Sequence, residues 1–186
     1  MKIGVYRGFH PMRVNSFMSI WSALHKSEWV YIELYYTSSW MIEEREKFTD
    51  ILSVFSNKFN NKKLVINLNC DINAVDALIE LQNQIIGQNI YVCTHVIKLF
   101  TLMQKTFDPK ICIGYKMLHP QDISLSSRIN FILIHVKEFS VENVRALRKS
   151  LPDISVYSYV CYDTSDLYSL HKYVPLLDVI FCTATL

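Results

Sequence analysis

Short apolar runs alternate along the chain with longer segments in which apolar residues recur at helical spacing. The runs predict strands at 2–6, 29–36, 64–68, 90–93, 111–114, 129–136, 154–161 and 178–183. The periodic segments between them predict helices at 15–25, 40–59, 95–107 and 166–173. Two more helices are expected to begin at the caps Asn73 and Ser140 and to end near Gly87 and Pro152.

This repeated alternation of strand and helix is typical of a mostly parallel sheet that is covered by helices. We therefore expect an α/β fold, a Rossmann-like three-layer sandwich with a sheet of about seven or eight strands. A single domain over residues 1–186 fits the length, and the longest loop is expected at 116–128.

Composition narrows the class of protein. Hydrophobic residues make up 51% of the chain, which excludes a disordered protein. The 19 basic and 17 acidic residues are spread evenly, so neither a nucleic-acid partner nor a basic membrane patch is expected. The chain has neither an apolar stretch long enough for a transmembrane segment nor an N-terminus of the signal-peptide kind, which predicts a cytoplasmic protein.

The cysteines do not form a motif. The five are Cys70, Cys93, Cys112, Cys161 and Cys182. No two have the CxxC spacing, and most lie in apolar runs, where a reduced thiol acts as a small hydrophobic group. We expect reduced, buried thiols, and neither a metal site nor a cofactor.

The loop after the first expected strand carries the first candidate site, because sheets of this kind bind ligands at the carboxyl ends of their strands. Gly8 allows a tight turn or a close approach of a ligand to the backbone. His10 is a candidate base, and Arg7 and Arg13 are candidates to bind phosphate or carboxylate groups. The alternative is a simple turn with solvated charges.

Other strand ends supply the remaining candidates. Thr37, Ser38 and His135 are candidate ligand-binding residues. Thr164, a further candidate ligand-binding residue, lies between Asp163 and Asp166 after the penultimate strand. These two acids either bind a hydroxylated ligand or a metal, or they cap the next helix. The chain has no GxGxxG or GxxxxGK[ST] sequence, so dinucleotide and P-loop binding are not predicted.

Four segments of the last third carry a family resemblance. They are 131–135 (FILIH), 144–149 (VRALRK), 156–163 (VYSYVCYD) and 178–183 (DVIFCT). In this order they resemble the end of the N-terminal, acceptor-side domain of GT-B glycosyltransferases of the spore-maturation type. The resemblance implies sugar transfer from a nucleotide-sugar to a glycan or other acceptor, with His10 or Asp163 as the catalytic base. The donor would bind to a second domain, so the chain is expected to be a fragment or a lone half, which leaves a partner domain or a homo-oligomer open.

Two alternatives stand beside this hypothesis. Only four glycines, no phosphate loop and 11 tyrosines favour a stand-alone Rossmann-like interaction or regulatory module without catalysis. The segments 8–11 (GFHP) and 125–128 (LSSR) faintly resemble nucleotidyltransferase motifs, although the second histidine of those enzymes is missing. A degenerate nucleotidyltransferase-like enzyme is therefore the third hypothesis.

Overall fold

The computed structural model describes residues 2–6, 17–43, 46–70, 75–120, 128–160 and 171–182. Its parallel strands are β1 (Lys2–Tyr6), β2 (Trp29–Tyr36), β5 (Lys63–Asn69), β6 (Ile90–Thr94), β7 (Cys112–Met117), β8 (Phe131–His135), β9 (Ser155–Val160) and β10 (Val179–Cys182). The strands β3 (Trp40–Glu43) and β4 (Glu46–Lys47) form an antiparallel extension next to β2. The helices are α1 (Phe17–Lys26), α2 (Phe48–Lys58), α3 (Val75–Ile85), α4 (Ile97–Thr106), α5 (Val141–Ser150) and the 3-10 turn η1 (Val174–Leu176).

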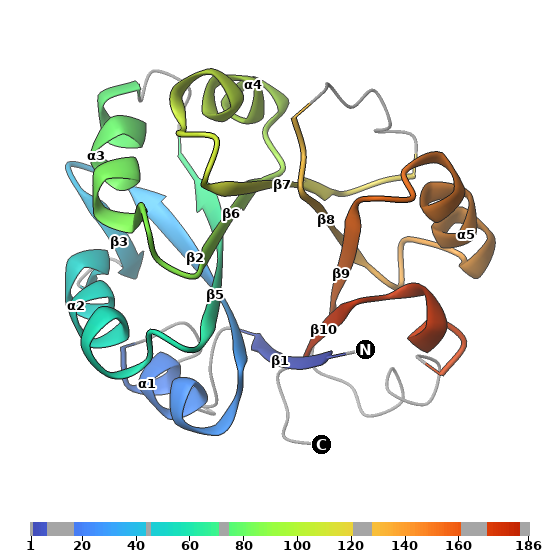
Figure 1. Cartoon of the computed structure of the whole chain (residues 1–186), viewed down its shortest axis with the longest axis horizontal. Coiled ribbons are helices and arrows are strands. Elements are labelled where there is room, and N and C mark those ends of the chain that lie inside the picture. Colours follow the sequence, from blue (N-terminus) through green and yellow to red (C-terminus); the bar gives the residue numbers. More distant parts are fainter. Residues whose placement is uncertain are drawn as a thin grey trace.

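The eight parallel strands form a closed ring. Their order is β1-β2-β5-β6-β7-β8-β9-β10, and β1 pairs in parallel with both β2 and β10. Gly4 is the register partner of Trp29 on one side and of Phe181 on the other. Figure 1 looks into this ring and shows the α-helices around its outside. The protein is therefore a TIM-barrel-like α/β fold.

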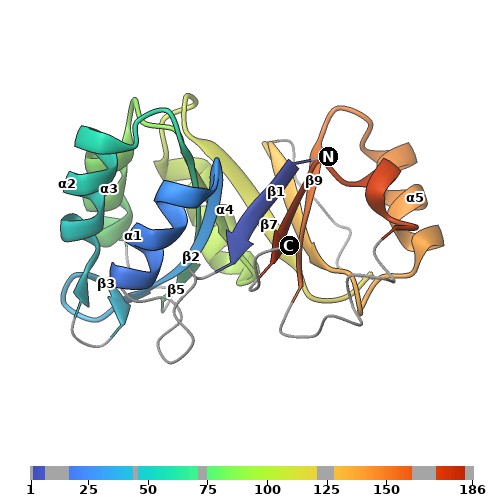
Figure 2. The ribbon, with the colours of Figure 1, turned by 90° about the horizontal axis from the view of Figure 1, so that it is seen from below.

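The ring corrects the predicted Rossmann-like sandwich. The alternation of strands and helices was predicted correctly, and the eight parallel strands lie where strands were expected. The sheet has ten strands and not seven or eight, because β3 and β4 were not predicted. The sheet, however, curls until its first and last strands pair, so helices cover only its outer face (Figure 2). The inner face instead encloses a second core that consists of side chains from the strands alone.

Two separate groups of apolar side chains result from this arrangement. The inner group consists of Trp29, Tyr31, Val65, Cys93, Phe131, Leu133, Tyr157, Tyr159, Val179 and Phe181. On each strand these positions alternate with residues of the larger outer group, which packs against the helices. The rings of Phe131 and Tyr157 stack with centroids 4.9 Å apart, and Trp29 meets Tyr157 at 5.4 Å. The inner core is thus a packed aromatic interior and not a channel.

One glycine makes room for this packing. A Cβ atom added to Gly114 of β7 would lie 2.5 Å from the ring of Phe131, its register partner on β8. Such a contact is far inside van der Waals distance, so a side chain at position 114 requires the Phe131 ring to move. The absence of a side chain at Gly114 therefore leaves the space that the Phe131 ring occupies in the barrel interior.

The start of the predicted helix 40–59 is wrong. Residues Trp40–Glu43 form β3, which pairs with the end of β2, and the helix begins only at Phe48. The indole Nε1 of Trp40 donates a hydrogen bond to the carbonyl of Ala77 at 2.9 Å, which fixes this strand against α3. Trp40 and Ile42 are of the aromatic and β-branched types that favour strands, and both are buried on the same side of β3.

Predicted helix ends agree better with the structure. Ser140 and Asn143 form a capping box at the start of α5, and Gly87 has a φ of +80° after α3. Asn73 lies outside the described residues. Of the predicted helix 166–173, only residues 171–173 are described, and they form a turn before η1.

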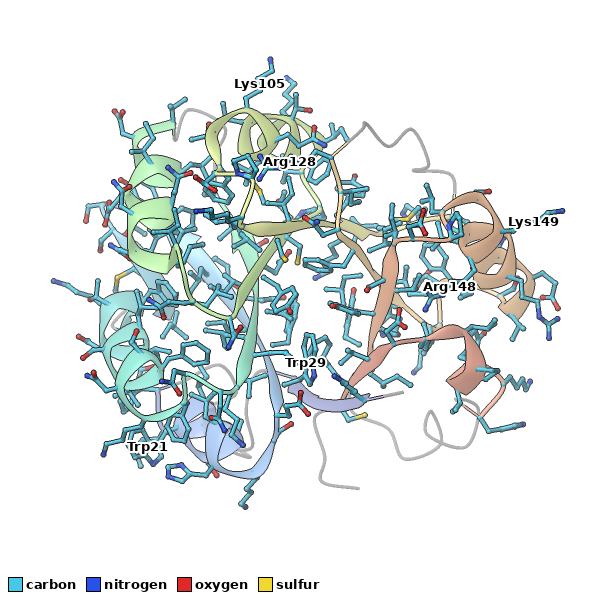
Figure 3. The ribbon with its side chains drawn as sticks, in the orientation of Figure 1. Trp21, Trp29, Lys105, Arg128, Arg148 and Lys149 are labelled. Atoms are coloured by element: carbon cyan, nitrogen blue, oxygen red, sulfur yellow. The ribbon has the colours of Figure 1, made fainter. Side chains whose placement is uncertain are left out.

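Two residues from the segments that resemble GT-B glycosyltransferases, Arg148 and Asp178, connect α5 to the starts of β9 and β10 at the amino end of the barrel. Arg148 donates from Nε to the carbonyl of Leu176 at 2.8 Å and from Nη1 to the carbonyl of Ile154 at 2.9 Å. Its Nη2 bonds to Asp178, whose Oδ2 also accepts from the backbone N–H of Val156. Figure 3 shows Arg148 on α5 beside these strands. The LRK and D-x-I-F elements therefore have a structural explanation in this fold.

Within the described ranges, no helix combines the length and the apolar character that crossing a membrane requires.

Replacing Gly114 by alanine should destabilise the protein by about 1–3 kcal/mol, because the new methyl group overpacks the barrel interior. Urea unfolding monitored by circular dichroism measures the change. The double variant Gly114→Ala/Phe131→Leu should lose less stability than the sum of the two single variants. Strict additivity would contradict the contact with Phe131 as the cause.

Candidate functional site

The carboxyl ends of all eight parallel strands open at the same end of the barrel, which we call the mouth. Barrels of this architecture place their active sites at this end. Polar side chains occupy inner positions near the carboxyl ends of five of the eight parallel strands. They are Glu33 of β2, Asn67 of β5, Lys116 of β7, His135 of β8 and Tyr159 of β9.

Glu33 and Lys116 form a buried ion pair at the mouth. The Nζ of Lys116 lies 3.6 Å from Oε1 of Glu33, and their side chains are 10% and 4% exposed. The tyrosine hydroxyls of β2 also contact this carboxylate: Tyr31 donates to Oε1 at 3.4 Å and Tyr35 donates to Oε2 at 3.1 Å. Burial of a charge is costly unless it is paired and hydrogen-bonded, and this pair meets both conditions.

Aromatic rings hold the ammonium group of Lys116 from other directions. Its Nζ lies 4.8 Å from the ring centroid of Tyr159 and 5.9 Å from that of Tyr31. The two rings are nearly parallel, with an interplanar angle of 9° and centroids 6.2 Å apart. Nζ also donates to the Tyr31 hydroxyl at 3.4 Å. Cation–π attraction therefore adds to the ion pair in fixing this charge.

Two neutral polar groups, Asn67 and Cys93, are fully buried in the same interior. The amide of Asn67 donates to Oδ1 of Asn69 at 3.2 Å, and the Cys93 thiol contacts Oδ1 of Asn67 at 3.9 Å. Burial raises the pKa of Cys93 to about 12, although the positive charge of Lys116 opposes the rise. Cys93 is therefore a thiol at neutral pH and not a nucleophilic thiolate.

Two histidines lie at the mouth, His135 as the last residue of β8 and His95 directly after β6. The ring of His135 lies 4.9 Å from that of Tyr159, whose other contacts include Lys116. His95 follows β6, and its Nδ1 is buried without a hydrogen-bond partner among the described residues. Burial lowers the pKa of His95, and the charge of Lys116 lowers it further against the opposing effect of Glu33. His95 is thus a neutral imidazole that can accept a proton.

The described residues include only part of the predicted site. His135 lies at the mouth, beside Tyr159. Thr37 and Ser38 are exposed in the bend that follows β2, where the Thr37 N–H donates to the carbonyl of Ser39 at 3.3 Å. The remaining candidates lie outside the described residues: Arg7, Gly8, His10, Arg13, Asp163 and Thr164.

Glu33 and Lys116 were not predicted as site residues from the sequence. Glu33 lies within the apolar strand WVYIELYY, and Lys116 was assigned to the loop 116–128, although β7 continues to Met117. A single charged residue inside a buried apolar run was the available signal, since such charges are rare without a partner. Among the residues that the structure describes, no group of three or more His, Cys, Asp or Glu side chains is arranged to hold a metal ion.

Comparisons with known proteins agree with the barrel. No family model matches the chain, and no curated protein matches it in sequence. Three solved structures match 98% of the chain. A glycerophosphodiester phosphodiesterase from Thermotoga maritima is 13% identical, with a TM-score of 0.68 and 94% of its chain covered. One from Parabacteroides distasonis ATCC 8503 is 12% identical, with a TM-score of 0.72 and 92% covered. A protein from Galdieria sulphuraria, assigned the same activity, is 11% identical, with a TM-score of 0.73 and 93% covered.

These findings overturn the sequence-based hypotheses of function. A GT-B acceptor domain, a Rossmann-like interaction module and a nucleotidyltransferase-like enzyme all require an open Rossmann-like sheet, whereas this sheet is closed. The nucleotide-sugar and the glycan acceptor lose their support with the glycosyltransferase, because the similar structures are phosphodiesterases. At identities of 11–13%, these neighbours show a shared fold.

The lowered pKa of His95 predicts that acidification destabilises the folded protein. The unfolded chain binds the proton more tightly than the folded one, so stability is complete above the ordinary pKa of 6.5 and falls as the pH drops below it. Urea unfolding between pH 7.5 and 5.5 should show this fall, and His95→Gln should make it smaller. An equal fall in both proteins would contradict the burial of a neutral His95.

The raised pKa of Cys93 predicts an unreactive thiol. The shift from 9.0 to about 12 lowers the thiolate fraction at pH 8 about a thousandfold, and burial blocks access as well. Iodoacetamide at pH 8 should label the half-buried Cys70 in the folded protein and should label Cys93 only in urea. Peptide mass spectrometry distinguishes the two, and rapid labelling of Cys93 in the native protein would contradict the prediction.

Proposed function

We propose that this protein is a phosphodiesterase that hydrolyses glycerophosphodiesters at the mouth of the barrel. The observation that carries the proposal is the buried Glu33–Lys116 pair at the carboxyl ends of the strands. The three solved structures support it, since each of them matches 98% of the chain. The proteins from Thermotoga maritima and Parabacteroides distasonis are glycerophosphodiester phosphodiesterases.

The groups at the mouth suit the charges of this reaction. A phosphodiester is an anion that gains further negative charge on its nonbridging oxygens as water attacks the phosphorus atom. The ammonium group of Lys116 supplies a fixed positive charge for those oxygens, and the rings of Tyr31 and Tyr159 keep it from turning into solvent. Fixed charges in a site with little water stabilise such a transition state more than solvated charges do.

The attacking water must give its proton to an unprotonated group at the mouth. The oxygen of water forms a bond to phosphorus while the bond from phosphorus to the leaving alcohol breaks. His95 is neutral and its Nδ1 is unbonded among the described residues, so we assign it the proton that the attacking water gives up. The leaving alcohol takes up a proton from solvent water, and a phosphomonoester remains. His95 returns its proton to solvent afterwards, so one water molecule has been added across the broken bond.

The test is an assay of purified protein with glycerophosphocholine, glycerophosphoethanolamine and glycerophosphoglycerol, with and without added Mg²⁺ or Ca²⁺. Released glycerol 3-phosphate should be detectable with at least one substrate. Lys116→Met should lower kcat/KM about 100-fold or more, because it removes the charge that faces the phosphate. The matched control is Lys105→Met on the exposed surface of α4 (Figure 3), which should leave the rate unchanged.

Two outcomes contradict this proposal. Folded protein that releases no product from any of the three diesters would exclude the activity. An equal effect of Lys105→Met and Lys116→Met would place the reaction away from the mouth.

A further inference from the structure

We propose that Glu33 competes with the phosphate group of a ligand for Lys116, so that an anion binds by taking the ammonium group from this carboxylate. The inference rests on the proposed function for the chemical class of the ligand, a phosphate ester. It adds that the free protein keeps its anion site occupied by a side chain of its own. Glu33 would thereby set the affinity of the site.

The ammonium group of Lys116 has unused capacity. It can donate three hydrogen bonds, and the one that it makes among the described residues goes to the Tyr31 hydroxyl at 3.4 Å. The distance of 3.6 Å to Glu33 exceeds the 2.7–2.9 Å of a charge-assisted hydrogen bond. The pair is held by charge without a tight bond, so a phosphate oxygen can form the shorter contact that Glu33 does not.

The carboxylate of Glu33 keeps other donors when the ammonium group is taken. Tyr35 donates to Oε2 and Tyr31 donates to Oε1, so a ligand that draws Lys116 away leaves hydrogen bonds in place. Among the described residues, the two anions would nevertheless share the ammonium group of Lys116 in a space that is almost closed to solvent. Repulsion between them weakens binding of the phosphate, and this repulsion is the competition that we infer.

The position of Lys116 does not depend on Glu33 alone. Tyr159 lies 4.8 Å from Nζ, and its ring in turn packs against His135 and stacks on Tyr31. Removal of the negative charge at position 33 should therefore leave the ammonium group where it is. Glu33→Gln has nearly the same shape as the native side chain, so it tests the charge without opening a cavity.

The experiment is isothermal titration of the full chain with inorganic phosphate and with glycerol 3-phosphate at constant ionic strength. Four proteins are compared: wild type, Glu33→Gln, Lys116→Met and Glu33→Gln/Lys116→Met. Glu33→Gln should bind both anions about tenfold more tightly than wild type, which corresponds to about 1.4 kcal/mol. Lys116→Met and the double variant should bind neither.

The double variant also controls for folding. Lys116→Met alone leaves the carboxylate of Glu33 buried without its cation, which is strongly destabilising, whereas the double variant removes both charges. Circular dichroism and thermal unfolding establish that each variant is folded. A folded double variant that binds phosphate as wild type does would overturn the inference, as would an affinity of Glu33→Gln equal to or below that of wild type.

The titration separates this inference from the proposed function. If wild type hydrolyses no diester but the four proteins follow the expected order of affinity, the competition stands and the phosphodiesterase activity falls. If the double variant hydrolyses diesters at the wild-type rate, the activity stands and the role of Lys116 and Glu33 falls.

Discussion

Pairing of β1 with both β2 and β10 is the constraint on which the rest of the structure depends. Three strand-to-strand steps separate β2 from β7 around the ring, which in a flat sheet would amount to about 14 Å. Closure brings Lys116 of β7 to 3.6 Å from Glu33 of β2. The same curvature lets Tyr31 of β2 stack on Tyr159 of β9, which is also three steps away. The mouth therefore exists because the sheet closes.

The local pattern of the sequence was sufficient for the elements but not for the closure. Apolar runs such as that of β8 are buried on both faces in an open sheet with helices on two sides and equally in a barrel. The pairing of β1 with β10 joins residues almost at the two ends of the chain, and no local signal specifies it. Capping is different, because Ser140 and Asn143 are three residues apart and their contact can be read from adjacent positions. The predicted helix start at Trp40 was wrong because the contact that holds this residue is not local. Its hydrogen bond goes to Ala77, which lies on a helix 37 positions away.

The candidate site also has one part that could be predicted from local sequence and one part that could not. The rule that ligands bind at the carboxyl ends of parallel strands holds for either fold, and His135 lies where it predicts. Glu33 and Lys116 are 83 positions apart, each embedded in its own strand, so only the closed ring shows that they meet. The short motifs of the last third were misleading because Arg148 and Asp178 perform a structural task that many folds require, the binding of exposed backbone groups between strands and helix.

The two ends of the barrel use charge differently, and this contrast is the strongest argument that the mouth is functional. At the amino end, Arg148 bonds to the carbonyls of Leu176 and Ile154, so it replaces hydrogen bonds that the backbone would otherwise lack. At the mouth, and among the described residues, the ammonium group of Lys116 contacts side chains and no backbone carbonyl. Apolar residues of similar volume could fill that space at equal or better stability, as aromatic rings do one layer below. Among the residues that the structure describes, this buried ammonium group uses one of its three donors, so it contributes little to folding that an apolar side chain would not, and it has donors left for an anion.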